Sequence, residues 1–135
     1  GLITKVKNAV ELTRHNNRLV LCIAFNYGGR DEIVYAIKRM QSDRLDPEQI
    51  SEEMVSSYLF TSGVPDPDLI IRTSGEMRIS NFLIWQSAYS ELYITPTYWP
   101  DFDKEELRKA IIEFGQRDRR YGKVSSDQPG SDPED

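Results

Sequence analysis

Residues 67–93, which read PDLIIRTSGEMRISNFLIWQSAYSELY, contain the strongest structural pattern in the chain. The short apolar run from Leu69 to Ile71 predicts a buried strand. Arg72 stands where that strand ends, and a polar glycine turn then leads to Arg78 and Ser80. An apolar pattern typical of a helix follows Ser80. Two arginines, a turn and a helix start directly after a strand predict a site for a diphosphate group.

The composition is that of an ordinary globular protein of 135 residues, so we expect one domain with its own core. No apolar run approaches the roughly 20 residues of a membrane span, and the first residues lack the basic and then apolar order of a signal peptide. These features favour a cytoplasmic protein. Cys22, the single cysteine, lies in an apolar run, and we expect it to be buried. His15 is the only histidine, which excludes a metal site built on cysteine and histidine.

The charge argues against nucleic acid as a partner. The formal net charge is −5, and residues 123–135 hold one lysine and four acids, which leaves about −2 for the rest of the chain. A local pair of arginines can still dominate its surroundings and bind a small anion. The sequence therefore remains compatible with an anion site at Arg72 and Arg78.

Helical and strand patterns alternate along the chain. They predict helices over residues 2–14, from Ile33 to Met40, from Pro47 onward with Asp46 as the N-cap, and a last helix capped by Asp101 or Asp103. Strands are predicted over residues 18–25, 69–71 and 92–95. Residues 123–135 are predicted to be disordered. Strands separated by helices predict an α/β fold with a parallel sheet flanked by helices. Only three strands are visible, so we expect a partial domain that lacks its N-terminal strands.

The sequence NYGGR at residues 26–30 forms a second turn between a predicted strand and a predicted helix. As a phosphate loop it matches neither of the common glycine-rich fingerprints. Asp31 and Glu32 in the first helical turn suit the helix dipole but would repel a phosphate. We therefore favour a structural turn, with Arg30 tying it to neighbouring carboxylates.

Several motifs together resemble the cis-prenyltransferases, and among them the bacterial undecaprenyl diphosphate synthases (isoprenyl transferases). The motifs are NYGGR at 26–30, DLIIRTSGE at 68–76, RISNFLIWQ at 78–86, YSELY at 89–93 and WPDF at 99–102. The resemblance covers nearly all of residues 1–122 and corresponds to the C-terminal half of the family's domain.

The resemblance implies an enzyme that condenses isopentenyl diphosphate with an allylic diphosphate and makes each new double bond cis. It also implies Mg²⁺ dependence and a homodimer. In bacteria the product serves as the lipid carrier of cell-wall precursors, and the protein is expected to contact a membrane only through that product. The matching positions imply that Arg72, Arg78 and Ser80 bind the isopentenyl diphosphate and that Glu91 helps to hold Mg²⁺. The family's C-terminal Arg-X-Gly, which reaches the partner's active site, matches Arg120 and Gly122.

Plainer interpretations stay open for each residue taken alone. Arg72 at a strand end can be a surface ion-pair residue, Ser80 a helix cap and Glu91 a solvated carboxylate. Glu76 can simply orient the arginines. The aromatic side chains nearby, Trp85, Tyr89, Tyr93 and Trp99, fit packing in the core or at a dimer interface better than a prenyl tunnel.

The family's first block, His-X-X-Met-Asp-Gly-Asn-X-Arg-Trp, is absent, and with it the aspartate for Mg²⁺ and catalysis. No catalytic residue is therefore expected within this chain, and we expect it to be inactive by itself. Met77 replaces a histidine of some members, so no proton or metal role is predicted there. The alternative is a non-catalytic partner subunit of a heteromeric cis-prenyltransferase, although such a subunit has no need of Arg72 and Arg78.

Overall fold

The computed structural model describes residues 1–117. Its elements in chain order are helix α1 (Leu2–Thr13), helix α2 (Gly29–Ser42), the short 3-10 turn η1 (Pro47–Gln49), helix α3 (Glu52–Tyr58), strand β1 (Leu69–Arg72), strand β2 (Glu91–Ile94), a second 3-10 turn η2 (Trp99–Asp101) and helix α4 (Lys104–Gln116). The predictions for Arg120, Gly122 and the tail at 123–135 lie outside the described residues. Within residues 1–117, no helix combines the length and apolar character needed to cross a membrane.

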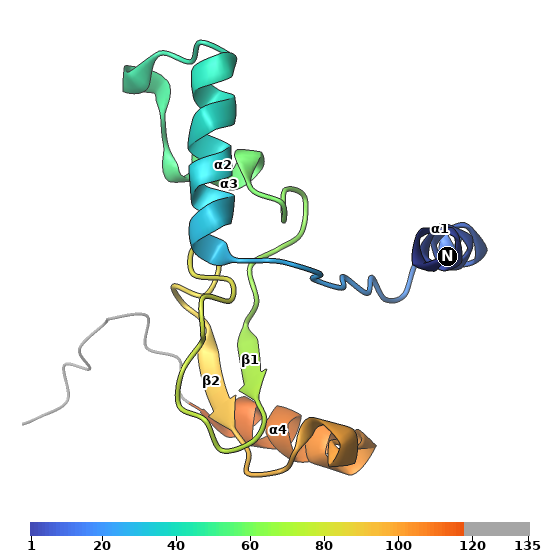
Figure 1. Cartoon of the computed structure of the whole chain (residues 1–135). Helices are drawn as coiled ribbons and strands as arrows, with labels where there is room; N and C mark the ends of the chain where they lie inside the picture. The colour runs from blue at the N-terminus through green and yellow to red at the C-terminus, as the bar shows by residue number, and fades with distance from the viewer. Residues whose placement is uncertain (118–135) are drawn as a thin grey trace, which may run out of the picture.

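The two strands run parallel, with Leu69 opposite Glu91 and Arg72 opposite Ile94. Arg72 is the last residue of β1, and the long connection between the strands, residues 73–90, carries the other predicted anion-binding residues, Arg78 and Ser80. Figure 1 shows α2 and α3 side by side beyond one end of this sheet, and α4 near the ends toward which both strands point. The predicted α/β class with a parallel sheet flanked by helices is confirmed.

Helix α2 begins against the loop that follows the predicted site. The backbone N–H of Gly29 donates to the carbonyl of Asn81 at 2.7 Å, and the N–H of Arg30 donates to the Asn81 side-chain oxygen at 3.0 Å. Asn81 therefore occupies helix-start donors that could otherwise bind an anion. This supports the structural interpretation of the glycine turn. Arg30 was predicted to tie this turn to neighbouring carboxylates through its side chain. The contact that the structure shows is instead made by the Arg30 backbone N–H, which donates to the side chain of Asn81.

Glycine at position 29 permits this contact. A Cβ there would lie 3.0 Å from the Ile84 nitrogen and 3.2 Å from the Asn81 carbonyl oxygen, whereas a Cβ at Gly115 in α4 would meet nothing within 4 Å. Backbone atoms cannot move aside as a side chain can. The close approach of the two segments thus depends on the missing side chain.

We expect Gly29→Ala to destabilise the fold by about 1–3 kcal/mol, because it overpacks a backbone contact. Gly115→Ala is the matched control and should stabilise by about 0.4–1 kcal/mol through a less flexible unfolded chain. Urea denaturation followed by circular dichroism measures both. Equal effects of the two substitutions would show that the Gly29–Asn81 contact is not tight in solution.

Residues 18–25 do not form the predicted strand. They are irregular, and the side chains of Leu19, Val20, Leu21, Ile23 and Phe25 are 66–81% exposed. A strand needs a neighbour for its backbone groups, and in the described part of the chain β1 and β2 pair only with each other. Cys22, predicted to be buried, is exposed for the same reason. Helix α1 lies apart from the other elements in Figure 1 and has no buried residue.

Two predicted helices are also wrong in part. Asp46 caps only the short turn η1; the helix itself starts later, where the Ser51 hydroxyl accepts from the Met54 N–H at 3.2 Å. The apolar pattern after Ser80 forms a series of turns and no helix. Ser80, Asn81 and Leu83 have φ values of 48°, 64° and 47°, a left-handed conformation that a right-handed helix excludes.

A buried carboxylate lies where α2, the segment after α3 and residues 82–90 meet. Glu32 is completely buried and accepts from the Tyr27 hydroxyl at 2.5 Å, the Phe60 N–H at 2.8 Å and the Gln86 amide nitrogen at 3.1 Å. Burial, together with the bond to Glu32, raises the pKa of the Tyr27 hydroxyl. Sequence reasoning treated Glu32 only as a favourable charge at a helix start.

Candidate functional site

A two-residue left-handed turn fixes the chain directly after Arg72. Ser74 and Gly75 have φ values of 69° and 68°. Their N–H groups donate to the carbonyls of Thr97 and Thr95, at 3.0 Å and 2.9 Å. The turn is therefore anchored on the segment that leaves β2, and the chain folds back toward Arg72.

Glu76, which follows this turn, joins the two arginines. One carboxylate oxygen pairs with Nη2 of Arg72 and the other with Nη2 of Arg78. The exposed fractions of the three side chains are 33% for Arg72, 34% for Glu76 and 63% for Arg78. The bond from Arg72 is the main cause that holds the pKa of the Glu76 carboxyl below its usual value, with the charge of Arg78 adding to it. The sequence predicted that Arg72 and Arg78 meet, and the structure brings them together.

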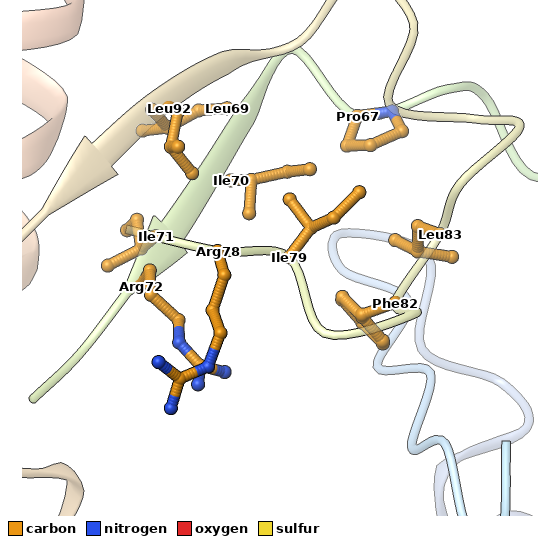
Figure 2. A pocket seen from close by; sticks show the side chains of 10 residues that line it. All are labelled: Pro67, Leu69, Ile70, Ile71, Arg72, Arg78, Ile79, Phe82, Leu83 and Leu92. Atoms are coloured by element: carbon orange, nitrogen blue, oxygen red, sulfur yellow. The ribbon is translucent and has the colours of Figure 1, made fainter. Parts of the chain in front are cut away.

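The arginine pair borders a cavity of about 300 Å³ with mostly apolar walls. Its lining residues are Pro67, Leu69, Ile70, Ile71, Arg72, Arg78, Ile79, Phe82, Leu83 and Leu92. Figure 2 shows the Arg72 and Arg78 side chains extending together to one side of the aliphatic wall made by Ile70 and Ile79. The Nε atom of Arg72 is buried and has no hydrogen-bond partner among the described residues. This arrangement suits a ligand with an anionic group joined to a short hydrocarbon part.

Ser80 lies two residues beyond Arg78, on the exposed part of the loop. Its predicted role rested partly on the free N–H groups of a following helix, and that helix is absent because the backbone is left-handed at Ser80 and Asn81. The hydroxyl of Ser80 can still donate to an anion near Arg78.

Glu91 does not join the arginines. It starts β2 opposite Leu69, so it lies at the other end of the sheet from Arg72, about 10 Å along the strands. Its carboxylate accepts from Nη1 of Arg117 at 3.0 Å, and Arg117 also pairs with Glu113 at 2.7 Å. The hydrogen bond to Glu113, and next the one to Glu91, raise the pKa of the Arg117 guanidinium. No group of three or more metal-ligating side chains occurs among residues 1–117.

Sequence reasoning gave too little weight to two residues of this region. Glu76 was read as one that can orient the arginines, and its place in the sequence between Arg72 and Arg78, directly after the glycine turn, was the available signal. Asn81 was missed; an asparagine between a serine and an apolar run is typical of a left-handed position with side-chain bonds to nearby backbone.

Comparison with known proteins matches residues 1–122 to a family model described as "Putative undecaprenyl diphosphate synthase". An isoprenyl transferase of Heliobacterium mobile is 52% identical over 124 residues, which are 89% of this chain and 48% of that protein. An isoprenyl transferase of Streptococcus agalactiae is 57% identical over 120 residues, with 83% and 48% covered. The chain thus spans about half the length of the curated relatives it matches.

Two solved structures share the fold. Lavandulyl diphosphate synthase from Lavandula x intermedia, in complex with dimethylallyl diphosphate, superposes with a TM-score of 0.84 and 34% identity over 90% of this chain and 54% of that one. A probable undecaprenyl diphosphate synthase from Campylobacter jejuni superposes with a TM-score of 0.75 and 37% identity over 89% and 55%.

Proposed function

The chain belongs to the undecaprenyl diphosphate synthase family of prenyltransferases, and we propose that it carries the isopentenyl diphosphate-binding half of a cis-prenyltransferase. One observation carries this proposal: Arg72 and Arg78 converge beside an apolar cavity. Two guanidinium groups offer paired donors for diphosphate oxygens, and the aliphatic wall suits a short isoprenyl group. Ser80 would add a hydroxyl donor to the same anion.

The reaction proposed for the complete enzyme joins the alkene carbon of isopentenyl diphosphate to the allylic carbon of the second substrate, with release of the allylic diphosphate as pyrophosphate and of one proton from the isopentenyl unit. In this chain Arg72 and Arg78 would hold the diphosphate that is retained, and Ile70 and Ile79 would exclude water from the isoprenyl carbons. We further propose a homodimer, a cytoplasmic enzyme and a cis-polyprenyl product of the lipid-carrier type. Arg120 and Gly122 are proposed to contact the substrate of the partner subunit. The dimethylallyl diphosphate of the related lavender structure supports the class of substrate.

Mg²⁺ is proposed as the cofactor of the complete enzyme, with Glu91 as one ligand. Residues 1–117 do not make a Mg²⁺ site by themselves, because Glu91 is a single carboxylate already paired with Arg117. Mg²⁺ commonly takes one or two protein carboxylates, with phosphate oxygens and water as its other ligands. Glu91 would therefore have to leave Arg117 and share the ion with groups from outside the described residues.

A complementation experiment tests the proposal. The chain is mixed with the half of the Heliobacterium mobile isoprenyl transferase that lies outside the match, and incorporation of labelled isopentenyl diphosphate is measured with Mg²⁺ and an allylic diphosphate. We expect no incorporation by either half alone and measurable incorporation by the mixture. At limiting isopentenyl diphosphate, Arg72→Ala in the chain should lower that activity roughly 30-fold or more, while Arg108→Ala on the exposed side of α4 should leave it unchanged.

Two results would contradict the proposal. A mixture that stays inactive although the two halves associate would argue against the missing-half interpretation. Activity that Arg72→Ala leaves unchanged would show that this chain acts as a non-catalytic partner, since its own diphosphate site would then be dispensable.

A further inference from the structure

Glu76 bridges two arginines, whereas a simple surface ion pair joins one acid to one base. It contacts Arg72 with one oxygen and Arg78 with the other, and it is held by the left-handed turn that Thr95 and Thr97 anchor. A carboxylate fixed in this way sets the separation of the two guanidinium groups.

Glu76 uses only one nitrogen of each arginine. Each guanidinium carries five N–H donors, so most of them remain free for a ligand. The Nε of Arg72 is not among these exposed donors, because it is buried, with no hydrogen-bond partner among the described residues. The three side chains together keep one net positive charge. The bridge therefore leaves the arginines ready to bind while lowering their attraction for anions in general.

Two opposite roles follow from the same contacts. Glu76 can compete with the ligand for the arginines, and its removal would then strengthen binding of every anion. It can instead fix both arginines in the geometry that a ligand needs, and its removal would then weaken binding of a ligand that reaches both. The exposure of Arg78, 63%, favours the second role, because a long and exposed side chain without this bridge would have to be ordered by the ligand itself.

We propose that Glu76 is a positioning residue that makes the arginine pair selective for a diphosphate over a single phosphate group. The inference rests on the proposed function. A carboxylate between two guanidinium groups keeps their outer donors apart, so that two linked phosphoryl groups span both arginines while one phosphoryl group engages mainly one. Selectivity then comes from the spacing and not from the charge alone.

The test compares inorganic pyrophosphate with inorganic phosphate by calorimetric titration of the 135-residue chain at fixed ionic strength. The variants are Glu76→Ala and Glu76→Gln; the second keeps the size of the side chain but turns an amide NH₂ toward one arginine. Glu105→Ala is the matched control, since it removes an equal charge and an ion pair with Arg108 on α4. Circular dichroism and the melting temperature show whether each variant is folded.

We expect wild type to prefer pyrophosphate and Glu76→Ala to lower the ratio of pyrophosphate to phosphate affinity roughly tenfold through weaker pyrophosphate binding, because two arginines must then be ordered by the ligand. Glu76→Gln should give a smaller loss and Glu105→Ala none.

Other results overturn the inference. Stronger binding of both anions would show that Glu76 only competes for the arginines. A parallel loss for both anions with a lower melting temperature would show a role in folding alone, and an unchanged ratio would show no role. If wild type binds neither anion, the proposed function fails together with this inference. If wild type binds pyrophosphate, Arg72→Ala weakens that binding and the Glu76 variants leave both affinities unchanged, this inference fails and the proposed function stands.

Discussion

Replacing Arg72 with alanine is expected to weaken isopentenyl diphosphate binding by about 2–4 kcal/mol, or roughly 30- to 1000-fold in Kd. The Arg72 side chain is only 33% exposed, and its guanidinium lies between Glu76 and the apolar cavity. Its removal deletes a fork of donors and also leaves the Glu76 carboxylate with one cation instead of two, so that this carboxylate repels the diphosphate. Equilibrium titration with isopentenyl diphosphate measures the effect.

Arg72→Lys separates charge from geometry. Lysine keeps the positive charge but lacks the planar fork that matches two phosphate oxygens, so most of the loss should persist. Arg108→Ala is the control, because Arg108 is an exposed arginine of α4 in a similar ion pair with Glu105. Full recovery in Arg72→Lys would mean that the site reads charge alone. Unchanged affinity in Arg72→Ala would remove Arg72 from the site.

The same expectation applies less strongly to Arg78. From the sequence the two arginines are equivalent partners of one diphosphate. The structure separates them by burial, since Arg78 is 63% exposed and Arg72 is 33% exposed. Exposed charge contacts are screened by water and contribute less. We therefore place Arg78→Ala at the lower end of the range given for Arg72→Ala.

Local signals predicted the elements that depend on local chemistry. The apolar run before Arg72 does form β1, and the predicted strand at 92–95 is β2, shifted by one residue. Asp103 caps α4 as predicted, with its carboxylate accepting from the N–H groups of Glu105 and Glu106 at 2.9 Å and 3.0 Å. In each case the residues that determine the element are its own neighbours in sequence.

Elements that depend on distant contacts could not be predicted in this way. The apolar spacing after Ser80 indicated a helix, but Asn81 bonds the start of α2, more than fifty residues earlier, and holds the chain in a left-handed conformation. Single side chains of this stretch instead make separate contacts: Trp85 donates to Ser56 at 2.9 Å, and Gln86, its one buried side chain, donates to Glu32. Residues 19–25 have strand composition without a strand neighbour, and composition alone does not supply one.

The candidate site follows the same division. Arg72, Glu76 and Arg78 lie within seven residues and share a turn, so their convergence could be predicted from the sequence. The relation of Glu91 to Arg72 depends on the register of β1 against β2. That register places Glu91 at the opposite end of the sheet. Neither strand carries a signal for its register, because both are short and partly buried on every residue.

The largest loss of stability is expected at Glu32, where alanine should destabilise the fold by about 2–4 kcal/mol, because buried donors lose their acceptor. The substitution removes the acceptor of three hydrogen bonds from a completely buried position; the Phe60 N–H loses this acceptor, and the Gln86 amide keeps only its bond to the Thr61 hydroxyl. The contact between α2 and residues 82–90, the segment that follows Ser80, would weaken as well. Thermal unfolding followed by circular dichroism measures the change.

Three variants show whether the carboxylate itself is responsible. Glu32→Gln keeps the volume but presents one amide NH₂ to groups that are donors, so we expect a loss of about 1–3 kcal/mol. Tyr27→Phe removes one of the three donors and should cost about 1 kcal/mol. Asp31→Ala changes the exposed neighbour in the same first turn of α2, where only the helix dipole is affected, by about 0.3–1 kcal/mol. If Glu32→Gln were as stable as the wild type, the charge would be unimportant, and packing of α2 against the loop would instead explain why Glu32 is buried.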